Sequence, residues 1–360
     1  MTVYALTVFL GSFLLFQIQP LIGKYILPWY GGSPAVWTTC MLFFQVALLA
    51  GYGYAYLSSR LSGKRQAFVH ALFLAGALLF IPIAPSADFW ASSVVHSPQA
   101  SILLLLTATI GLPYFTLSAT APLVQHWFVR SCPGRSPYRL YALSNAGSFI
   151  ALLSYPILIE PRFLLNRQIV WWGWVFVVFV LCCGWCLLRL ARTLEPDFVS
   201  PAGPDEERQH GNPASTDIVK WLLLSACGSG LLLATTNQLC QEVAVIPFLW
   251  IVPLALYLIT FIVCFNSERA CDRLLWGILL AASVGAACRV VSLGVYINLP
   301  IQILILLAAL FTSCMVCHGE LARSSPDPRH LTVYYLIIAP GGAAGGIFVA
   351  LVAPSLFKGF

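Results

Sequence analysis

Thiol, imidazole and carboxylate side chains gather within a few residues near the end of one apolar segment. Cys314-Met315-Val316-Cys317-His318 has the C-x-x-C-H spacing of c-type haem attachment, and Glu320 follows it. The same groups bind zinc and other metals. Haem c is attached on the outer side of a membrane, which conflicts with the orientation derived below. Two interpretations stay open: a metal or redox site built from these residues, and a helix end whose His and Glu meet water.

A second set of polar side chains interrupts otherwise apolar segments. Such groups are costly in hydrocarbon unless they face one another or a water-filled cavity. They predict a ligand-binding cavity in the outer half of the membrane, with hydrogen bonds that only hold helices together as the alternative. The residues are Gln17, Gln19, Lys24, Thr38, Thr39, Gln45, Asn145, Asn237 and Gln238.

The carboxylates are placed differently, because all 13 fall in loops or near the ends of apolar segments. Active cation or polyamine transport commonly uses a carboxylate at mid-membrane. The distribution therefore argues against an active cation or polyamine transporter and leaves facilitated movement of a neutral solute open. No residue set predicts catalysis, and no cofactor is expected.

Composition identifies the solvent that surrounds these residues. The 360-residue chain is 59% hydrophobic and 9% charged, whereas soluble domains carry about 25% charged residues. A helix needs about 20 apolar residues to cross a bilayer. Eleven segments qualify and predict an all-α polytopic membrane protein: 3–27, 35–57, 67–85, 100–127, 137–158, 168–191, 217–241, 246–265, 272–291, 298–319 and 330–356.

A polar linker over 192–216 separates a first six-helix half, 1–191, from a second half, 217–360, which lacks a sixth helix. With the amino terminus in the cytoplasm, fourteen of the 19 Lys and Arg residues fall on the inner side. This predicts a multi-pass protein of a bacterial inner membrane. The basic residues are scattered between apolar runs, so nucleic acid is not an expected partner.

The two halves share short matches in the same order. Gly11-Ser12 corresponds to Gly228-Ser229, Arg130-Ser131 corresponds to Arg323-Ser324, and Gly147 and Gly345 each stand nine residues before a proline. Two parallel halves are the organisation of major-facilitator transporters. The run Gly341–Gly346 contains small-xxx-small patterns and predicts a face for close helix packing.

Longer segments resemble a known family. Residues 13–29 (FLLFQIQPLIGKYILPW), with 31–40, 117–123, 141–156, 314–321 and 341–354, are similar to the membrane part of bacterial fused major-facilitator/spermidine-synthase-like proteins. The resemblance implies a membrane module that anchors or feeds a C-terminal or separate synthase-like domain. The aminopropyltransferase-like domain of that family is absent from these residues, so no catalytic residue is carried over and enzyme activity is not expected.

Three functions therefore stay open. The first is the membrane module of a synthase-like fusion, and the second is a stand-alone transporter or solute-binding protein whose small-molecule ligand the sequence does not name. The third is a redox or metal protein that uses Cys314, Cys317, His318 and Glu320. In each case the lipid bilayer is the first partner.

Overall fold

The computed structural model describes residues 2–30, 34–83, 98–132, 137–192, 214–242, 251–267, 270–293, 296–327 and 330–356. All secondary structure in these ranges is helical. When each π-helical turn is counted with the helix that it continues, the described residues form eleven helical segments. The predicted all-α architecture is confirmed, although α3 begins before the predicted segment 67–85 and ends earlier.

The chain divides into two compact units, Met1–Gly211 and Asn212–Phe360, called the first and second half below. The first half contains α1 (Thr2–Tyr30), α2 (Pro34–Ser58), α3 (Gly63–Leu78), α5 (Pro98–Ser131), α6 (Tyr138–Ser154) with the π-helical turn η1 (Tyr155–Ile159), and α7 (Leu165–Arg192). The second half contains α9 (Ser215–Glu242), α10 (Ile251–Asn266), α11 (Arg273–Leu293), α12 (Leu299–Arg323) and α13 (Leu331–Ile347), which continues through η5 (Phe348–Val352) into α14 (Ala353–Leu356).

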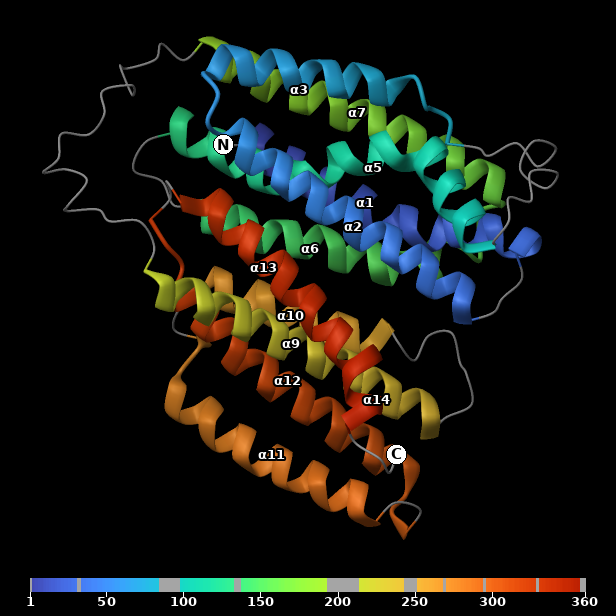
Figure 1. Cartoon of the computed structure of the whole chain (residues 1–360), viewed down its shortest axis with the longest axis vertical. Helices are drawn as coiled ribbons and strands as arrows, with labels where there is room; N and C mark the ends of the chain where they lie inside the picture. The colour runs from blue at the N-terminus through green and yellow to red at the C-terminus, as the bar shows by residue number, and fades with distance from the viewer. Residues whose placement is uncertain are drawn as a thin grey trace, which may run out of the picture. The chain divides into compact units, whose positions relative to one another are not determined.

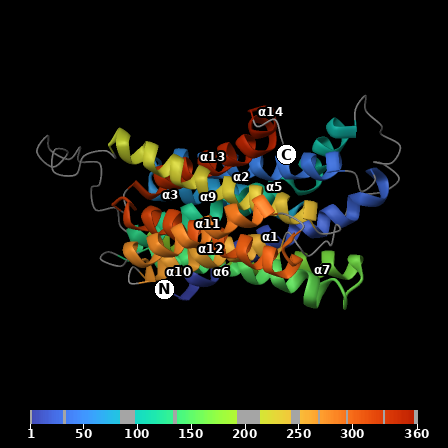
Figure 2. The same cartoon turned by 90° about the horizontal axis from the view of Figure 1, so that it is seen from below.

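The helices of the two halves pack in the same order. In the first half α1 packs against α5 and α6, while α5 also packs against α2 and α3. In the second half α9 packs against α12 and α13, while α12 also packs against α10 and α11 (Figure 1). In Figure 2, α9 and α13 again lie side by side. The first half adds α7, which packs against α1 and α3, and the described residues of the second half hold no counterpart of it.

The repeat extends to individual atoms. An added Cβ at Gly147 would lie 2.7 Å from the carbonyl oxygen of Phe9, and one at Gly345 would lie 2.1 Å from that of Ala226. Both glycines therefore let a helix pass close to the first helix of its half.

In each half, a serine stands three residues after the residue whose carbonyl oxygen the glycine approaches. This serine forms a hydrogen bond to the helix that carries the glycine. Ser12 Oγ lies 2.6 Å from Ser144 Oγ, and Ser229 Oγ donates to the carbonyl oxygen of Gly342 at 2.8 Å. Two corresponding contacts at each helix pair support the internal repeat read from the sequence.

Helix α7 shows why the surrounding solvent is lipid. Its inward stripe contains Trp172, Phe176 and Phe179, each at most 2% exposed. Its outward stripe is equally apolar, with Trp174 66% and Leu181 69% exposed. A helix that is apolar on all sides belongs in hydrocarbon.

Seven described helices are long and apolar enough to cross a membrane, and three shorter apolar helices accompany them. Together with the eleven-helix architecture, this gives a multi-pass membrane protein embedded in the bilayer.

Candidate functional site

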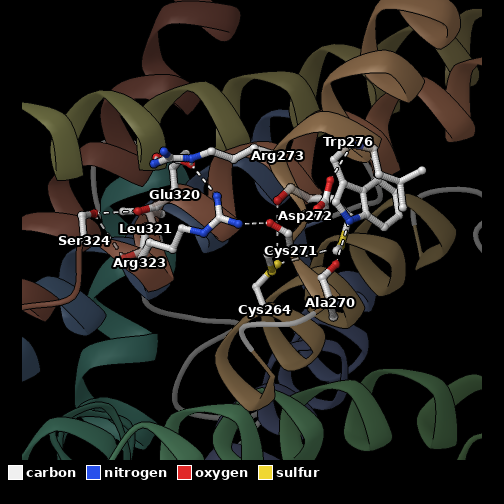
Figure 3. A network of polar contacts seen from close by, with 12 residues as sticks. Cys264, Ala270, Cys271, Asp272, Arg273, Trp276, Glu320, Leu321, Arg323 and Ser324 are labelled. Atoms are coloured by element: carbon white, nitrogen blue, oxygen red, sulfur yellow. Dashed lines mark hydrogen bonds and ion pairs between the residues drawn. The ribbon is translucent and has the colours of Figure 1, made fainter.

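The densest polar cluster lies at the end of α12, around the carboxylate of Glu320 (Figure 3). Arg273, the first residue of α11, donates to Glu320 through Nε at 2.6 Å and Nη2 at 2.8 Å. Arg323, one turn further along α12, donates to it at 3.0 Å, and Lys220 of α9 lies 3.5 Å away. One carboxylate thus binds three cations from three helices, and we call these four residues the Glu320 network.

The α12 end is also tied to its neighbours by uncharged groups. Trp221 Nε1 of α9 donates to the carbonyl oxygen of Ser324 at 2.9 Å, and the Tyr334 hydroxyl of α13 donates to that of Leu321 at 2.9 Å. The rings of Trp221 and Tyr334 meet edge to face at 5.0 Å. A helix end leaves its last carbonyl groups unpaired. Here side chains from α9 and α13 bind two of these carbonyl groups. The end of α12 is therefore a junction at which three helices of the second half meet.

Residues 270–272, just before α11, close the junction. Arg323 donates to the carbonyl oxygen of Cys271, and Trp276 Nε1 donates to that of Ala270 at 2.7 Å. Asp272 accepts the backbone N–H of Leu275 at 2.8 Å, which is an N-terminal cap of α11. The start of α11, and with it Arg273, is therefore held at a defined place beside α12 (Figure 3).

His318 lies two residues before Glu320 and has a different, buried surrounding. Its ring stacks on Phe261 at a centroid distance of 3.6 Å and meets Tyr257 edge-on at 4.7 Å. Its Nδ1 lies 2.8 Å from Thr260 Oγ1, which donates its one proton to the carbonyl oxygen of Tyr257 at 2.7 Å. A hydroxyl that donates to Tyr257 can only accept from His318, in the tautomer with the ring proton on Nδ1.

That assignment leaves Nε2 of His318 as an unprotonated acceptor. Nε2 is buried, has no hydrogen-bond partner in the structure, and lies 3.1 Å from where a Cβ of Gly228 would stand. Because Gly228 has no side chain, α9 can pass close to the imidazole ring.

The predicted metal or redox group is divided among separate contacts. Cys317 lies beside Cys227 of α9, His318 contacts Thr260, and Glu320 binds the two arginines. Successive helix residues are rotated by about 100°, so closeness in sequence did not bring these groups together. Within the described ranges, no group of three or more His, Cys, Asp or Glu side chains is placed to hold a metal ion.

The polar residues predicted to bind a ligand are also dispersed. In the first half, Gln19 Nε2 donates to the hydroxyl of Tyr114 at 3.4 Å, and Asn145 Nδ2 donates to the carbonyl oxygen of Tyr141 at 3.0 Å. Lys24 forms an ion pair with Glu160 at 2.6 Å, with both side chains more than a third exposed. These three side chains thus bind protein partners.

The remaining members of the set differ in burial. Gln17 and Thr39 are buried, Gln238 is half-buried, and Gln45 and Asn237 are exposed. The side chain of Thr38 lies outside the described part of the structure. A binding role for the set stays a prediction.

Sequence reasoning missed Lys220 and Arg273 as partners of Glu320. The sequence marks both only as basic residues expected on the inner side of the membrane. A usable signal was present, because Arg273 stands in the first turn and Lys220 in the second turn of an apolar helix, and Glu320 stands in the last turn of a third helix. In a bundle of antiparallel neighbours, such turns can meet at one end.

Comparisons with known proteins show the fold. No protein-family model and no curated protein matches the chain. Among solved structures, it is similar to the proton:xylose symporter XylE of the major facilitator superfamily, with 14% identity and a TM-score of 0.59 over 99% of this chain and 88% of that one. It is also similar to the E. coli fucose:proton symporter FucP, with 14% identity and a TM-score of 0.50 over 97% and 91% of the two chains. The protein therefore has the fold of major-facilitator membrane transporters.

Proposed function

We propose that this protein transports a neutral polar solute across the membrane, and that the Glu320 network is a latch on one end of the pathway. The observation that carries the proposal is a single carboxylate that ties α9, α11 and α12 together in a major-facilitator fold. Transport requires a protein that alternates between two conformations. Ion pairs near water are suited to this task, because they are individually weak and re-form readily.

The electrostatics of the cluster explain why Glu320 would control it. Its side chain is 21% exposed, so it is partly shielded from water. If its charge is removed, Lys220, Arg273 and Arg323 stay close together without a counter-charge. Like charges at this distance repel one another. Neutralising Glu320 therefore favours separation of the three helix ends.

Two observations support a neutral solute as the cargo. All 13 carboxylates of the chain fall in loops or near the ends of the apolar segments, which argues against a cation as cargo. The two similar structures are symporters of xylose and of fucose. Neutral sugars are therefore the first solutes to test.

The latch is tested with Glu320→Gln in the full chain. Cys271 is 4% exposed and its carbonyl is held by Arg323 of the network, so its thiol reports whether the end has opened. We expect alkylation of Cys271 by maleimide to become about tenfold faster in E320Q, which corresponds to about 1.4 kcal/mol in the equilibrium between closed and open states.

The matched control is Glu160→Gln, which removes the carboxylate of the exposed Lys24 pair in the first half. This variant should leave the alkylation rate of Cys271 unchanged. Equal rates in wild type and E320Q, with both proteins folded, would refute the latch.

A second candidate is the membrane module of a synthase-like fusion. It rests on the resemblance of residues 13–40, and of shorter segments further along the chain, to the membrane part of such fusions. No family model matches the chain. The intact mass of the natively expressed protein separates the two candidates. A mass near 39.4 kDa leaves no room for a synthase domain in the same chain, whereas a much larger mass supports the fusion.

A further inference from the structure

Two cysteines flank the segment that leads into the Glu320 network. Cys264 lies in the last turn of α10, and Cys271 lies just before α11; they are 1% and 4% exposed. Both cysteines pack on α12: the sulfur of Cys264 lies beside Met315, and that of Cys271 lies beside Gly319, one turn further along. Figure 3 shows both side chains on the α12 side of the segment, next to Arg323. Two thiols held against successive turns of one helix need only a small movement to bring their sulfurs together.

The position of Cys271 is fixed from two sides. Arg323 holds its carbonyl oxygen, and its side chain packs on Gly319 of α12, where an added Cβ would lie 3.3 Å from Cys271 Cβ and 3.5 Å from Sγ. Cys264 is also in contact with α12, with its sulfur 3.8 Å from the carbonyl oxygen and 3.9 Å from the Sδ of Met315. The pair is thus placed by the fold and does not depend on a chance encounter of flexible side chains.

The surroundings of Cys271 also favour its reactive form. The neighbouring Cys264 thiol and the Arg323 guanidinium lower the pKa of the Cys271 thiol, against the opposing effects of burial and of the Glu320 carboxylate. The thiolate is the nucleophile in cysteine oxidation and exchange. The two members of the pair therefore have different roles: Cys271 attacks first and Cys264 resolves.

We propose that Cys264 and Cys271 form a reversible dithiol–disulfide pair that is oxidised by peroxide. The Cys271 thiolate attacks one peroxide oxygen, so that an S–O bond forms, the O–O bond breaks, and the departing hydroxide takes up a proton to become water. The sulfur of Cys264 then attacks the sulfenic acid of Cys271. An S–S bond forms, the S–O bond breaks, and the departing hydroxide leaves with the Cys264 proton as a second water. An external dithiol returns both residues to thiols by exchange.

The disulfide would join the end of α10 to the residue two positions before Arg273. Because Arg273 makes the bidentate contact with Glu320, the bond restricts the freedom of α11 to move away from the network. This consequence for transport rests on the proposed function. Formation of the bond does not, since it depends only on the two thiols and the oxidant.

A second thiol pair in the same half serves as a comparison. Cys227 of α9 and Cys317 of α12 are also neighbours. Both lie within helices that qualify as membrane spans. The pair at Cys264 and Cys271 stands instead at a helix end beside charged groups, and is expected to react first.

The experiment uses the full chain in detergent or native membranes. The protein is treated with hydrogen peroxide, its free thiols are blocked with N-ethylmaleimide, and its peptides are identified by mass spectrometry. We expect a disulfide between Cys264 and Cys271 that dithiothreitol reverses. In Cys264→Ser, oxidation should stop at a sulfenic acid on Cys271, which dimedone traps. In Cys271→Ser, Cys264 should stay unmodified at the peroxide dose that oxidises the wild type.

The pH dependence supplies a further check. Because the pKa of Cys271 is lowered, its thiolate forms at lower pH than an ordinary cysteine thiolate, whose pKa is about 8.5. The rate of peroxide reaction should therefore rise with pH, with a midpoint below that value, and fall as the pH drops through the shifted pKa.

Cys227→Ser is the control and should leave the 264–271 disulfide intact. The proposal is overturned if both thiols of the wild type remain available to N-ethylmaleimide after oxidation, or if Cys264 and Cys271 pair with other cysteines. A disulfide that forms in a protein without solute flux would leave this proposal standing and count against the transport proposal.

Discussion

His318 shows how one buried polar residue is accommodated inside the second half. A single hydroxyl, that of Thr260, accepts the proton of Nδ1, and aromatic rings cover the ring face and edge. Leaving a buried donor without an acceptor costs about 1–3 kcal/mol. The bond between Thr260 and His318 should therefore be the feature of this site that is most sensitive to a small change.

Thr260→Val keeps the shape of the side chain and removes the acceptor. We expect a loss of about 1–3 kcal/mol in the free energy of unfolding, because Nδ1–H is left buried and unpaired. Unfolding by a denaturing detergent, followed by circular dichroism, measures the change. Thr260→Ser retains the hydroxyl and should lose less stability than T260V. Equal losses in the two variants would show that the hydroxyl does not hold His318.

At the scale of single residues, the sequence pointed to residues that make specific contacts, but it did not identify the residues that they contact. Cys317, His318 and Glu320 stand out by type and spacing, and all three have specific contacts. Their partners come from α9, α10 and α11, which the sequence does not place around α12. The ion pair of Lys24 with Glu160 was missed for the same reason.

At the scale of helices, the close approach of α9 and α13 depends on the spacing of small residues. Gly341 and Gly345 stand one turn apart and face α9, where an added Cβ would meet Ser225 and Ala226 at about 2 Å. Gly342 and Gly346, their immediate neighbours, have open space around the Cβ position. The structure thus confirms a packing face in this run and shows which of its glycines make the contact.

Gly345→Ala should push α13 away from α9, since its Cβ would overlap the carbonyl oxygen of Ala226. We expect a cost of about 1–3 kcal/mol, as for other overpacked sites. Gly346→Ala adds the same methyl group to the same helix and should be neutral or slightly stabilising, because alanine favours helix more than glycine does. The two variants are compared by thermal unfolding in detergent. A G345A protein as stable as G346A would contradict the packing described here.

The helices themselves were predictable because hydropathy reports burial in lipid directly. Apolar runs of about 20 residues mark helices whether their faces meet protein or hydrocarbon, as the two apolar stripes of α7 show. Helix ends were less predictable. Helix α3, for example, begins at Gly63, within a basic stretch that hydropathy assigns to a loop.

At the scale of the whole molecule, the sequence predicts two similar halves, and the structure shows the major-facilitator fold over nearly the full chain. The identity of the solute was not predictable in the same way. Specificity depends on a few side chains that converge in space, and the polar residues singled out here are spread over several helices of both halves.

The central claim is transport, and the most direct test is solute flux through the full chain in proteoliposomes. Swelling of the vesicles after an osmotic step is followed by light scattering, with D-xylose, L-fucose and D-glucose as solutes. We predict a flux of at least one of these sugars that is selective, exceeds that of protein-free vesicles, and changes in E320Q but not in E160Q. Flux equal to that of protein-free vesicles for all three sugars, from folded and correctly inserted protein, would contradict the account.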